Sequence, residues 1–323
     1  MIHLDHISTY RIGDEVKVGG DKRLKITSTL GDALNLHETY RCVQLDQPGG
    51  SLVLKKFRDQ GLGYELMQRD ALDAFTHFRG VREQLVAAGL PDMHFCDSRH
   101  LVMDFIPGTN LENYEFSADI KDRVAYIRDL LLSVIQPMEA LRQAGLVHRD
   151  IKAPNMIVRK NVTTSPGQKS SVITLIDLDM LTPSLDAPPS RKTTVFGTCS
   201  HMSTEVVNTG FYQFGSDVYA LGVTGIEMLE HALDMSIMNT YTAYCENFQD
   251  YARNRHNKSW LLRDRWPQLV EDVSNSPYSW DPQSVRQVLG LIHECLHDEV
   301  SDRPKNGEVM RQLLADTGNI KEL

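Results

Sequence analysis

A group of polar side chains interrupts the apolar stretch GLVHRDIKAPNMIV, which covers residues 145–158. Asp150 can accept a proton, the ammonium group of Lys152 can neutralise a phosphate oxygen, and the carboxamide oxygen of Asn155 can bind a hard cation such as Mg²⁺. Taken singly, each is an ordinary residue for a turn between a helix and a strand. Whether the three act together depends on what else the chain supplies.

Two further charged residues stand within apolar runs. Lys55 lies in SLVLKKF (residues 51–57), and a lysine at an inward position of a strand needs a partner or an anionic ligand. Asp177 follows an apolar strand in TLIDLDM (residues 174–180). The order of strand lysine, Asp-Lys-Asn group and strand-end aspartate is more specific than any one of these signals.

The elements that position these residues fall into two halves. Alternating or apolar runs predict strands over residues 22–30, 39–45, 51–57, 93–97 and 100–105, with a helix over 63–88 that breaks near Gly80. A long helix over 118–144, short strands on either side of a polar loop, and further helices from Asp217 onward follow. We therefore expect an α+β, two-lobed chain, joined near Phe105, with a cleft at the junction.

Composition limits the classes of partner. The chain has 323 residues, 34 Lys plus Arg and 43 Asp plus Glu, for a net charge of −9, which disfavours nucleic acid and anionic membranes. Five widely spaced cysteines, without a CxxC pair, indicate free thiols and no zinc site. The N-terminal residues lack a signal-peptide pattern and no run is long enough to span a bilayer. We expect a cytoplasmic protein, in its own cell or in a host cell into which it is delivered.

The chain resembles the protein kinase superfamily, in its eukaryotic-like Ser/Thr branch, over about residues 22–316. The motifs that carry the resemblance are VLK at 53–55, HRDIKAPN at 148–155, DLD at 177–179, GTCSHMSTE at 197–205, SDVYALG at 216–222 and SDRP at 301–304. The resemblance implies a two-lobed kinase fold: an N-terminal extension over 1–21, an N-lobe over 22–105, and a C-lobe over 106–323 with an activation segment at about 177–205.

The resemblance assigns catalytic and metal-binding roles. Asp150 would orient or accept the acceptor's hydroxyl proton, and Lys152 would neutralise the transferring γ-phosphate. Lys55 would hold the α- and β-phosphates of ATP, and Asn155 and Asp177 would coordinate Mg²⁺, with Mn²⁺ as the alternative ion.

The adenine contact and the structural roles also follow from the resemblance. Met103 would close the rear of the ATP pocket, and the hinge would run through Asp104, Phe105 and Ile106. Four residues would support the catalytic loop and the activation segment: Glu205 and Arg303 as a buried ion pair, Asp217 as an acceptor for catalytic-loop N–H groups, and Thr198 as a hydrogen-bond partner of Asp150 and Lys152.

Arg149, beside the catalytic aspartate, would dock a phosphate group on the activation segment. Thr193 and Thr194 stand where that phosphate would be placed, and a second copy of the chain would be the partner in trans-autophosphorylation. The alternative is that these threonines are ordinary loop residues and that Arg149 pairs with a carboxylate.

Three features depart from the family pattern. The loop that covers phosphates keeps Gly31 but lacks the second and third glycines. The helix glutamate that pairs with Lys55 is assigned to Glu83, with Glu65 as the second choice. Asp179 replaces the glycine of the DFG motif, and we expect its side chain to face solvent.

The leading hypothesis is an ATP-dependent Ser/Thr protein kinase acting on a protein hydroxyl, because Lys152 matches the Ser/Thr pattern. One alternative is a pseudokinase scaffold with weakened nucleotide binding, which the glycine-poor loop favours. Another is a small-molecule kinase of the aminoglycoside-phosphotransferase type, which shares the Asp-Asn-Asp pattern. The protein substrate is not specified by the sequence.

Overall fold

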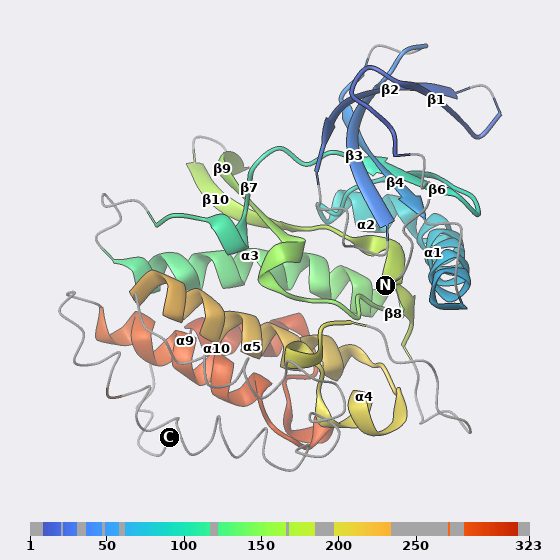
Figure 1. Cartoon of the computed structure of the whole chain (residues 1–323). Helices are drawn as coiled ribbons and strands as arrows, with labels where there is room; N and C mark the ends of the chain where they lie inside the picture. Colours follow the sequence, from blue (N-terminus) through green and yellow to red (C-terminus); the bar gives the residue numbers. More distant parts are fainter. Residues whose placement is uncertain are drawn as a thin grey trace, which may run out of the picture. The chain divides into compact units, whose positions relative to one another are not determined.

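The computed structural model divides the chain into two compact units, one comprising Met1–Pro107 with Leu178–Thr182 and the other Gly108–Asp177 with Pro183–Leu323 (Figure 1). The structure describes residues 9–20, 22–30, 37–46, 49–57, 62–116, 122–165, 168–184, 197–233, 271 and 281–315. The short return of Leu178–Thr182 to the first unit matters for the site, because it brings the DLD motif's last residue to the strand that carries Lys55.

A six-stranded antiparallel sheet forms the first unit, in the order β1-β2-β3-β4-β6-β5. Its strands are β1 (Glu15–Val18), β2 (Lys22–Thr29), β3 (His37–Gln44), β4 (Ser51–Phe57), β5 (Met93–Cys96) and β6 (His100–Asp104). Alternating side chains of β1, β2 and β3 are buried in one apolar cluster, as expected for a sheet with one covered face. β1 lies within the segment that the sequence predicted as an N-terminal extension, so part of that segment pairs with β2.

Two helices follow β4 where the sequence predicted one helix with a break near Gly80. They are α1 (Leu62–Gly80) and α2 (Arg82–Ala87). Val81, between them, leaves the helical conformation with φ −130° and ψ 17°. The break has a physical cause, since Gly80 has the highest backbone freedom in this stretch and Val81 is β-branched.

Four of the described helices of the second unit pack against one another (Figure 1). They are α3 (Arg123–Gln143), α5 (Phe214–Leu233), α9 (Pro282–Cys295) and α10 (Gly307–Ala315). Two aspartates cap helix N-termini: Asp122 accepts from the N–H of Ala125 at 2.8 Å, and Asp281 accepts from that of Ser284 at 2.9 Å. The apolar stripe of α3 supplies the centre of this core.

Short elements surround the four helices. They are β7 (Thr109–Asn110), η1 (Leu111–Asn113), β8 (Leu146–Val147), η2 (Ala153–Asn155), β9 (Met156–Ser165), β10 (Gln168–Leu175), η4 (Cys199–His201), α4 (Thr204–Thr209) and η5 (Val300–Asp302). η3 (Leu178–Met180) belongs to the first unit, and β11 (Thr182–Pro183) spans the point where the chain returns to the second.

The polar stretch after the catalytic loop differs from the prediction. Instead of a loop between short strands, β9 and β10 continue as a paired antiparallel hairpin with register shifts near Lys169 and Val172. Because β10 packs on α3, the buried residues Ile173 and Leu175 anchor the hairpin, and the polar part extends from that anchored end.

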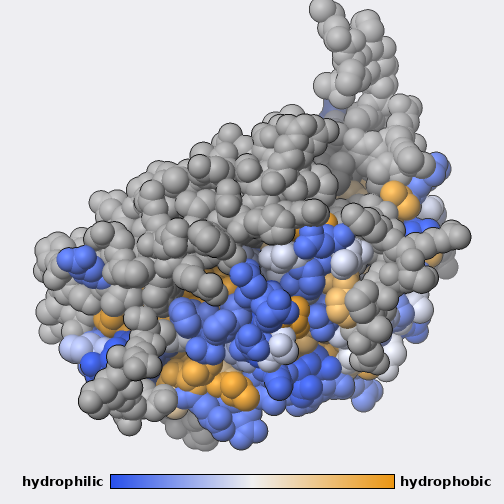
Figure 2. Space-filling view, turned by 90° about the horizontal axis from the view of Figure 1, so that it is seen from below, coloured by the Kyte–Doolittle hydropathy of each residue, from blue (hydrophilic) through white to orange (hydrophobic). Residues whose placement is uncertain are grey.

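The surface of the described part is mixed in character. In the view of Figure 2, hydrophilic side chains surround smaller hydrophobic patches. Among the described helices, none combines the length and the apolar character that a membrane crossing requires.

A carboxylate joins α3 to the start of α10. Glu139 accepts from the Arg142 guanidinium at 2.7 and 2.8 Å and from the backbone N–H of Gly307 at 2.8 Å. The hydrogen bonds from Arg142 outweigh partial burial and lower the pKa of Glu139 from 4.5 to about 2. A carboxyl group whose pKa is lower in the folded chain than in the unfolded chain stabilises the fold at every pH above its unfolded pKa. That stabilisation is lost as the pH falls through the folded pKa.

We predict that Glu139→Gln lowers the free energy of unfolding by about 1–3 kcal/mol at pH 7, because it removes charge-assisted hydrogen bonds. The difference from the wild type shrinks as the pH falls from about 4.5 towards 2. Urea unfolding at several pH values measures it, with the exposed Glu112→Gln as the control. A pH-independent difference would contradict the assignment.

Candidate active site

The catalytic loop is held by a buried carboxylate on α5. Asp217 accepts from the backbone N–H of His148 at 2.7 Å and from that of Arg149 at 3.0 Å. Burial raises the pKa of Asp217, although these N–H groups favour the ionised form. Arg149 has a φ of 74°, a left-handed conformation that costs a non-glycine residue free energy and persists only where contacts hold it. Asp217 therefore fixes the backbone immediately before Asp150.

Asp150 is the centre of a hydrogen-bonded group. Asn155 donates from Nδ2 to Asp150 Oδ2 at 2.8 Å, and Lys152 Nζ lies 2.8 Å from the same oxygen. Thr198 donates to Oδ1 both from its backbone N–H, at 3.1 Å, and from its hydroxyl, at 2.9 Å. The Thr198 hydroxyl also accepts from Lys152 at 2.7 Å. The structure thus brings together four of the residues that the sequence singled out.

These contacts keep Asp150 ionised. Burial alone would raise its pKa, but the charge of Lys152 and the hydrogen bonds from Lys152 and Thr198 outweigh burial and lower the pKa below its ordinary value. An ionised, oriented carboxylate can accept a hydrogen bond from a substrate hydroxyl and accept its proton as the oxygen becomes a nucleophile.

Gly197 lets the activation segment approach the catalytic loop. Its φ is 116°, and a Cβ there would lie 2.8 Å from the carbonyl oxygen of Arg149. A side chain would therefore push away the segment that carries Thr198. The glycine is required by both its backbone conformation and the close contact.

Asp177 follows a backbone segment held beside Asn155. The N–H of Ile176 donates to the carbonyl of Asn155 at 2.9 Å, and Nε2 of His148 lies 3.0 Å from the carbonyl of Ile176. Asp177 itself is in the left-handed region with a φ of 70°. The side-chain nitrogen of Asn155 donates to Asp150, so the side-chain oxygen of Asn155 is the atom that can bind a cation.

In the first unit, Lys55 lies on the central strand β4 and is 3% exposed. Its Nζ is 2.9 Å from Oδ1 of Asp179, which is 4% exposed. Burial would raise the pKa of Asp179, but the charge of Lys55 leads the effects that lower it.

Two expectations are corrected by this ion pair. Asp179 does not face solvent, since it is buried against Lys55. Glu83 lies on α2 with an exposed side chain, and Glu65, the second choice, is exposed in the first turn of α1. The buried ammonium of Lys55 needs a nearby negative charge. Because η3 packs against α1, the carboxylate of Asp179 lies close enough to provide that charge. The sequence feature that could have indicated this partner is the second aspartate of DLD, a charged residue in an otherwise apolar run.

The neighbouring residue Lys56 points elsewhere. Its Nζ lies 3.7 Å from Glu38 and 4.7 Å from the centre of the Tyr10 ring. Adjacent residues of a strand face opposite sides of the sheet, so Lys55 is the lysine that meets η3.

The predicted hinge follows β6. Met103 is 3% exposed and pairs with Val53 of β4. The N–H of Asp104 donates to Asp92 at 2.9 Å and that of Phe105 donates to Ser51 at 3.1 Å. The guanidinium of Arg41 stacks 4.3 Å from the Phe105 ring centre, and Ile106 follows as a half-buried residue.

A bidentate ion pair holds the end of the activation segment. Arg303 is 2% exposed, and its guanidinium donates to the two carboxylate oxygens of Glu205 at 2.8 and 3.1 Å. Ser203 and Ser216 also donate to Glu205, at 2.6 and 3.0 Å. The charge-assisted contacts lower the pKa of Glu205 against the opposing effect of burial.

Three predicted site residues lie outside the described residues: Gly31 of the phosphate-covering loop, and Thr193 and Thr194 of the activation segment. Arg149, the predicted phosphate-docking residue, stacks with its guanidinium 4.5 Å from the centre of the Tyr212 ring.

The family model described as "Protein kinase domain" matches residues 85–315. The chain belongs to this family. The match begins on α2 and leaves out Lys55.

Relatives of this kinase chain include a receptor-like serine/threonine-protein kinase of Arabidopsis thaliana, 29% identical over 172 residues, covering 52% of this chain and 20% of that protein. Serine/threonine-protein kinase PknA of Corynebacterium glutamicum is 27% identical over 182 residues, covering 54% of this chain and 34% of that protein. The chain thus spans a minor part of these relatives. The structure of vaccinia related kinase 3 matches with a TM-score of 0.57 and 13% identity, covering 95% and 90% of the two chains, and shows the shared fold.

We predict that Asp179→Asn lowers the stability of the protein by about 3 kcal/mol, because removing one partner of a buried ion pair leaves the other charge poorly compensated. Replacing both partners, in the double variant Lys55→Met with Asp179→Asn, should cost less than the sum of the single substitutions Lys55→Met and Asp179→Asn. Chemical unfolding of all four proteins measures this coupling free energy. Additive effects would show that the two side chains act independently.

Proposed function

We propose that this chain is an ATP-dependent Ser/Thr protein kinase that transfers the γ-phosphoryl group of ATP to a protein hydroxyl. The observation that carries the proposal is the Asp150 group: a buried, ionised carboxylate held by Asn155, Lys152 and Thr198. Phosphoryl transfer needs little covalent chemistry from a protein, so positioning and charge neutralisation are the main requirements.

Each member of the group has a part in the transfer. Asp150 orients the acceptor hydroxyl and takes its proton as the oxygen attacks phosphorus. Lys152, 22% exposed at its side chain, has an ammonium that neutralises the charge on the transferring group. Thr198 holds Asp150 and Lys152 at the same time, so the base and the cation keep a fixed separation.

The residues present fit a divalent cation with oxygen ligands. Asn155 is 6% exposed with its amide nitrogen committed to Asp150, and Asp177 supplies a carboxylate on the adjoining segment. Asn155 and Asp177 would hold Mg²⁺, or Mn²⁺ in its place. When bound, the ion would supply positive charge for the phosphate oxygens. The side chains of Asn155 and Asp177 would determine the position of the phosphates.

Nucleotide binding is assigned to residues of the first unit. Lys55 holds the α- and β-phosphates, and Asp179 positions its ammonium in the absence of a nucleotide. The N–H groups of Asp104 and Phe105 already donate to protein carbonyls, which directs the adenine contact to the backbone of Ile106. Met103 closes the rear of the pocket as a buried side chain of β6.

Ser/Thr specificity rests on two lines of support. Lys152 stands two positions after Asp150 and contacts Thr198, as the Ser/Thr resemblance implies. The Arabidopsis and Corynebacterium relatives are both named serine/threonine-protein kinases.

One observation favours a second candidate, a pseudokinase scaffold. The ammonium of Lys55 is already neutralised by Asp179, so a nucleotide must compete with a buried carboxylate for it. A scaffold would bind ATP weakly and transfer nothing, whereas a kinase would release Lys55 to the phosphates.

We predict that the purified protein, with labelled ATP, Mg²⁺ and a cell lysate, labels protein on serine or threonine. Asp150→Ala should reduce the initial rate by at least about a hundredfold, because it removes the residue that orients and deprotonates the hydroxyl. The label incorporated into protein over time measures the rate, and phosphoamino-acid analysis of the labelled proteins identifies the acceptor.

The matched control is Asp70→Asn, an acidic residue on α1 to which no part in the transfer is assigned, and this variant should keep the wild-type rate. Label in small molecules only would assign the chain to the small-molecule kinases. Binding of MgATP without any transfer would favour the scaffold.

A further inference from the structure

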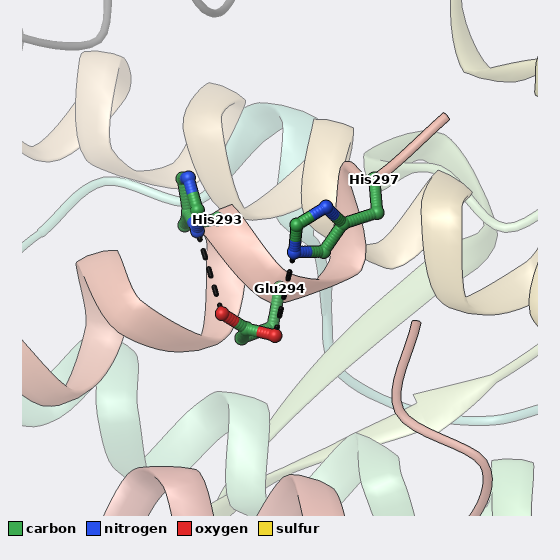
Figure 3. A group of neighbouring side chains, drawn as sticks. All are labelled: His293, Glu294 and His297. Carbon is green, nitrogen blue, oxygen red and sulfur yellow. Dashed lines mark hydrogen bonds and ion pairs between the residues drawn. The ribbon is translucent and has the colours of Figure 1, made fainter. Parts of the chain in front are cut away.

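Three potential metal ligands meet at the end of α9 (Figure 3). Nδ1 of His293 lies 3.4 Å from Oε1 of Glu294, and Nε2 of His297 lies 3.4 Å from Oε2 of the same carboxylate. The two imidazole rings have centres 5.3 Å apart and are nearly perpendicular. The helix ends at Cys295, so His297 comes from the turn that follows and the group joins the helix to that turn.

Each nitrogen–oxygen separation, to Oε1 for His293 and to Oε2 for His297, is long for a hydrogen bond and close to the spacing of neighbouring ligand atoms around an ion. Bonds of about 2.0–2.1 Å to a tetrahedral ion place neighbouring ligand atoms about 3.3–3.4 Å apart. Nitrogen–oxygen hydrogen bonds are shorter, at about 2.9 Å. One ligand atom from each of the three residues lies within 4.8 Å of the others, so small rotations of the side chains complete a shared site.

The donor types select the class of ion. Two imidazole nitrogens and one carboxylate oxygen suit Zn²⁺ and its neighbours among the transition metals, whereas Mg²⁺ takes oxygen ligands. The side chains of His293, Glu294 and His297 are 35, 38 and 28% exposed, so the group is accessible from solvent on one side. An ion bound here is therefore chemically distinct from the one proposed beside Asn155.

The neighbouring cysteine is not part of the group. Cys295 is fully buried, and burial raises the pKa of its thiol, which disfavours the thiolate that binds metals. The sequence feature that indicates this metal site is HECLH, residues 293–297. A search based only on the spacing of cysteines does not find it.

The same order occurs in zinc peptidases, where both histidines lie on one continuous helix and the glutamate acts as a base without binding the metal. Here the helix ends between the two histidines and Glu294 lies between both rings (Figure 3). This arrangement favours a structural clamp over a hydrolytic centre.

The clamp adjoins the ion pair that anchors the activation segment. Arg303 donates from Nε to the carbonyl of His297 at 2.7 Å and from Nη2 to the carbonyl of Asp298 at 2.9 Å. The same guanidinium binds Glu205. Fixing His297 therefore fixes one of the carbonyls that orient Arg303.

We propose that His293, Glu294 and His297 form a binding site for a zinc-class divalent ion that clamps the end of α9 to the turn preceding η5. The site uses none of the residues assigned to ATP binding or to phosphoryl transfer. Its occupation restrains residues 296–303, and through Arg303 it steadies the anchor at Glu205.

Titration of tag-free, metal-free protein with Zn²⁺ in a calorimeter tests the site, and Co²⁺ provides a visible spectrum that reports coordination by nitrogen and oxygen. We expect one Zn²⁺ per chain, a higher melting temperature with Zn²⁺ than with Mg²⁺, and slower amide exchange in residues 296–303. His293→Gln and His297→Gln should each weaken binding by at least about tenfold, and Glu294→Gln should also weaken it.

His77→Gln, on α1, is the matched control and should bind as the wild type does. Melting temperatures of the metal-free variants show whether each is folded, so that lost binding is read only in folded protein. Unchanged Zn²⁺ affinity in the double His293→Gln, His297→Gln variant would overturn the proposal. Absence of Zn²⁺ binding by the wild type would overturn it as well.

Discussion

The hydrogen bonds from the catalytic-loop backbone to Asp217 are the contacts on which the rest of the site depends. A carboxylate buried at the start of α5 is unfavourable without partners, and the N–H groups of His148 and Arg149 are those partners. The same two contacts hold Arg149 in its left-handed conformation. Because Asp150 follows directly, its direction is set by a helix that belongs to the core and not by the loop alone.

Three ion pairs, each with at least one buried partner, share one feature: a charged side chain is fixed by a partner that is itself held in place. Asp150 has Lys152, and Glu205 has Arg303. In the first unit, Lys55 has Asp179. Buried pairs of this kind contribute little net stability relative to apolar residues, because desolvation offsets attraction. Their value here is geometric: each holds its charged groups in one orientation.

Much of the site could be predicted from sequence because its residues lie in short motifs with local geometry. The HRDIKAPN stretch places Asp150 and Asn155 close enough for the amide to reach the carboxylate. The partner of Lys55 could not be predicted in this way. It depends on how a segment more than a hundred residues later returns to the sheet, and such long-range packing leaves no periodic signal. Glu83 had a plausible place in the chain, yet the break at Val81 puts it on a separate short helix, where its side chain is exposed.

The most direct measurement is the formation of ADP and phosphorylated product from ATP by the purified protein as a function of Mg²⁺ concentration. The account predicts transfer that depends on the ion, is lost in Asn155→Ala and Asp150→Asn, and is retained in Asp70→Asn. Equal turnover in the wild type and Asp150→Asn, or no transfer by the wild type at saturating MgATP with an accepting lysate, would contradict the claim that the Asp150 group catalyses phosphoryl transfer.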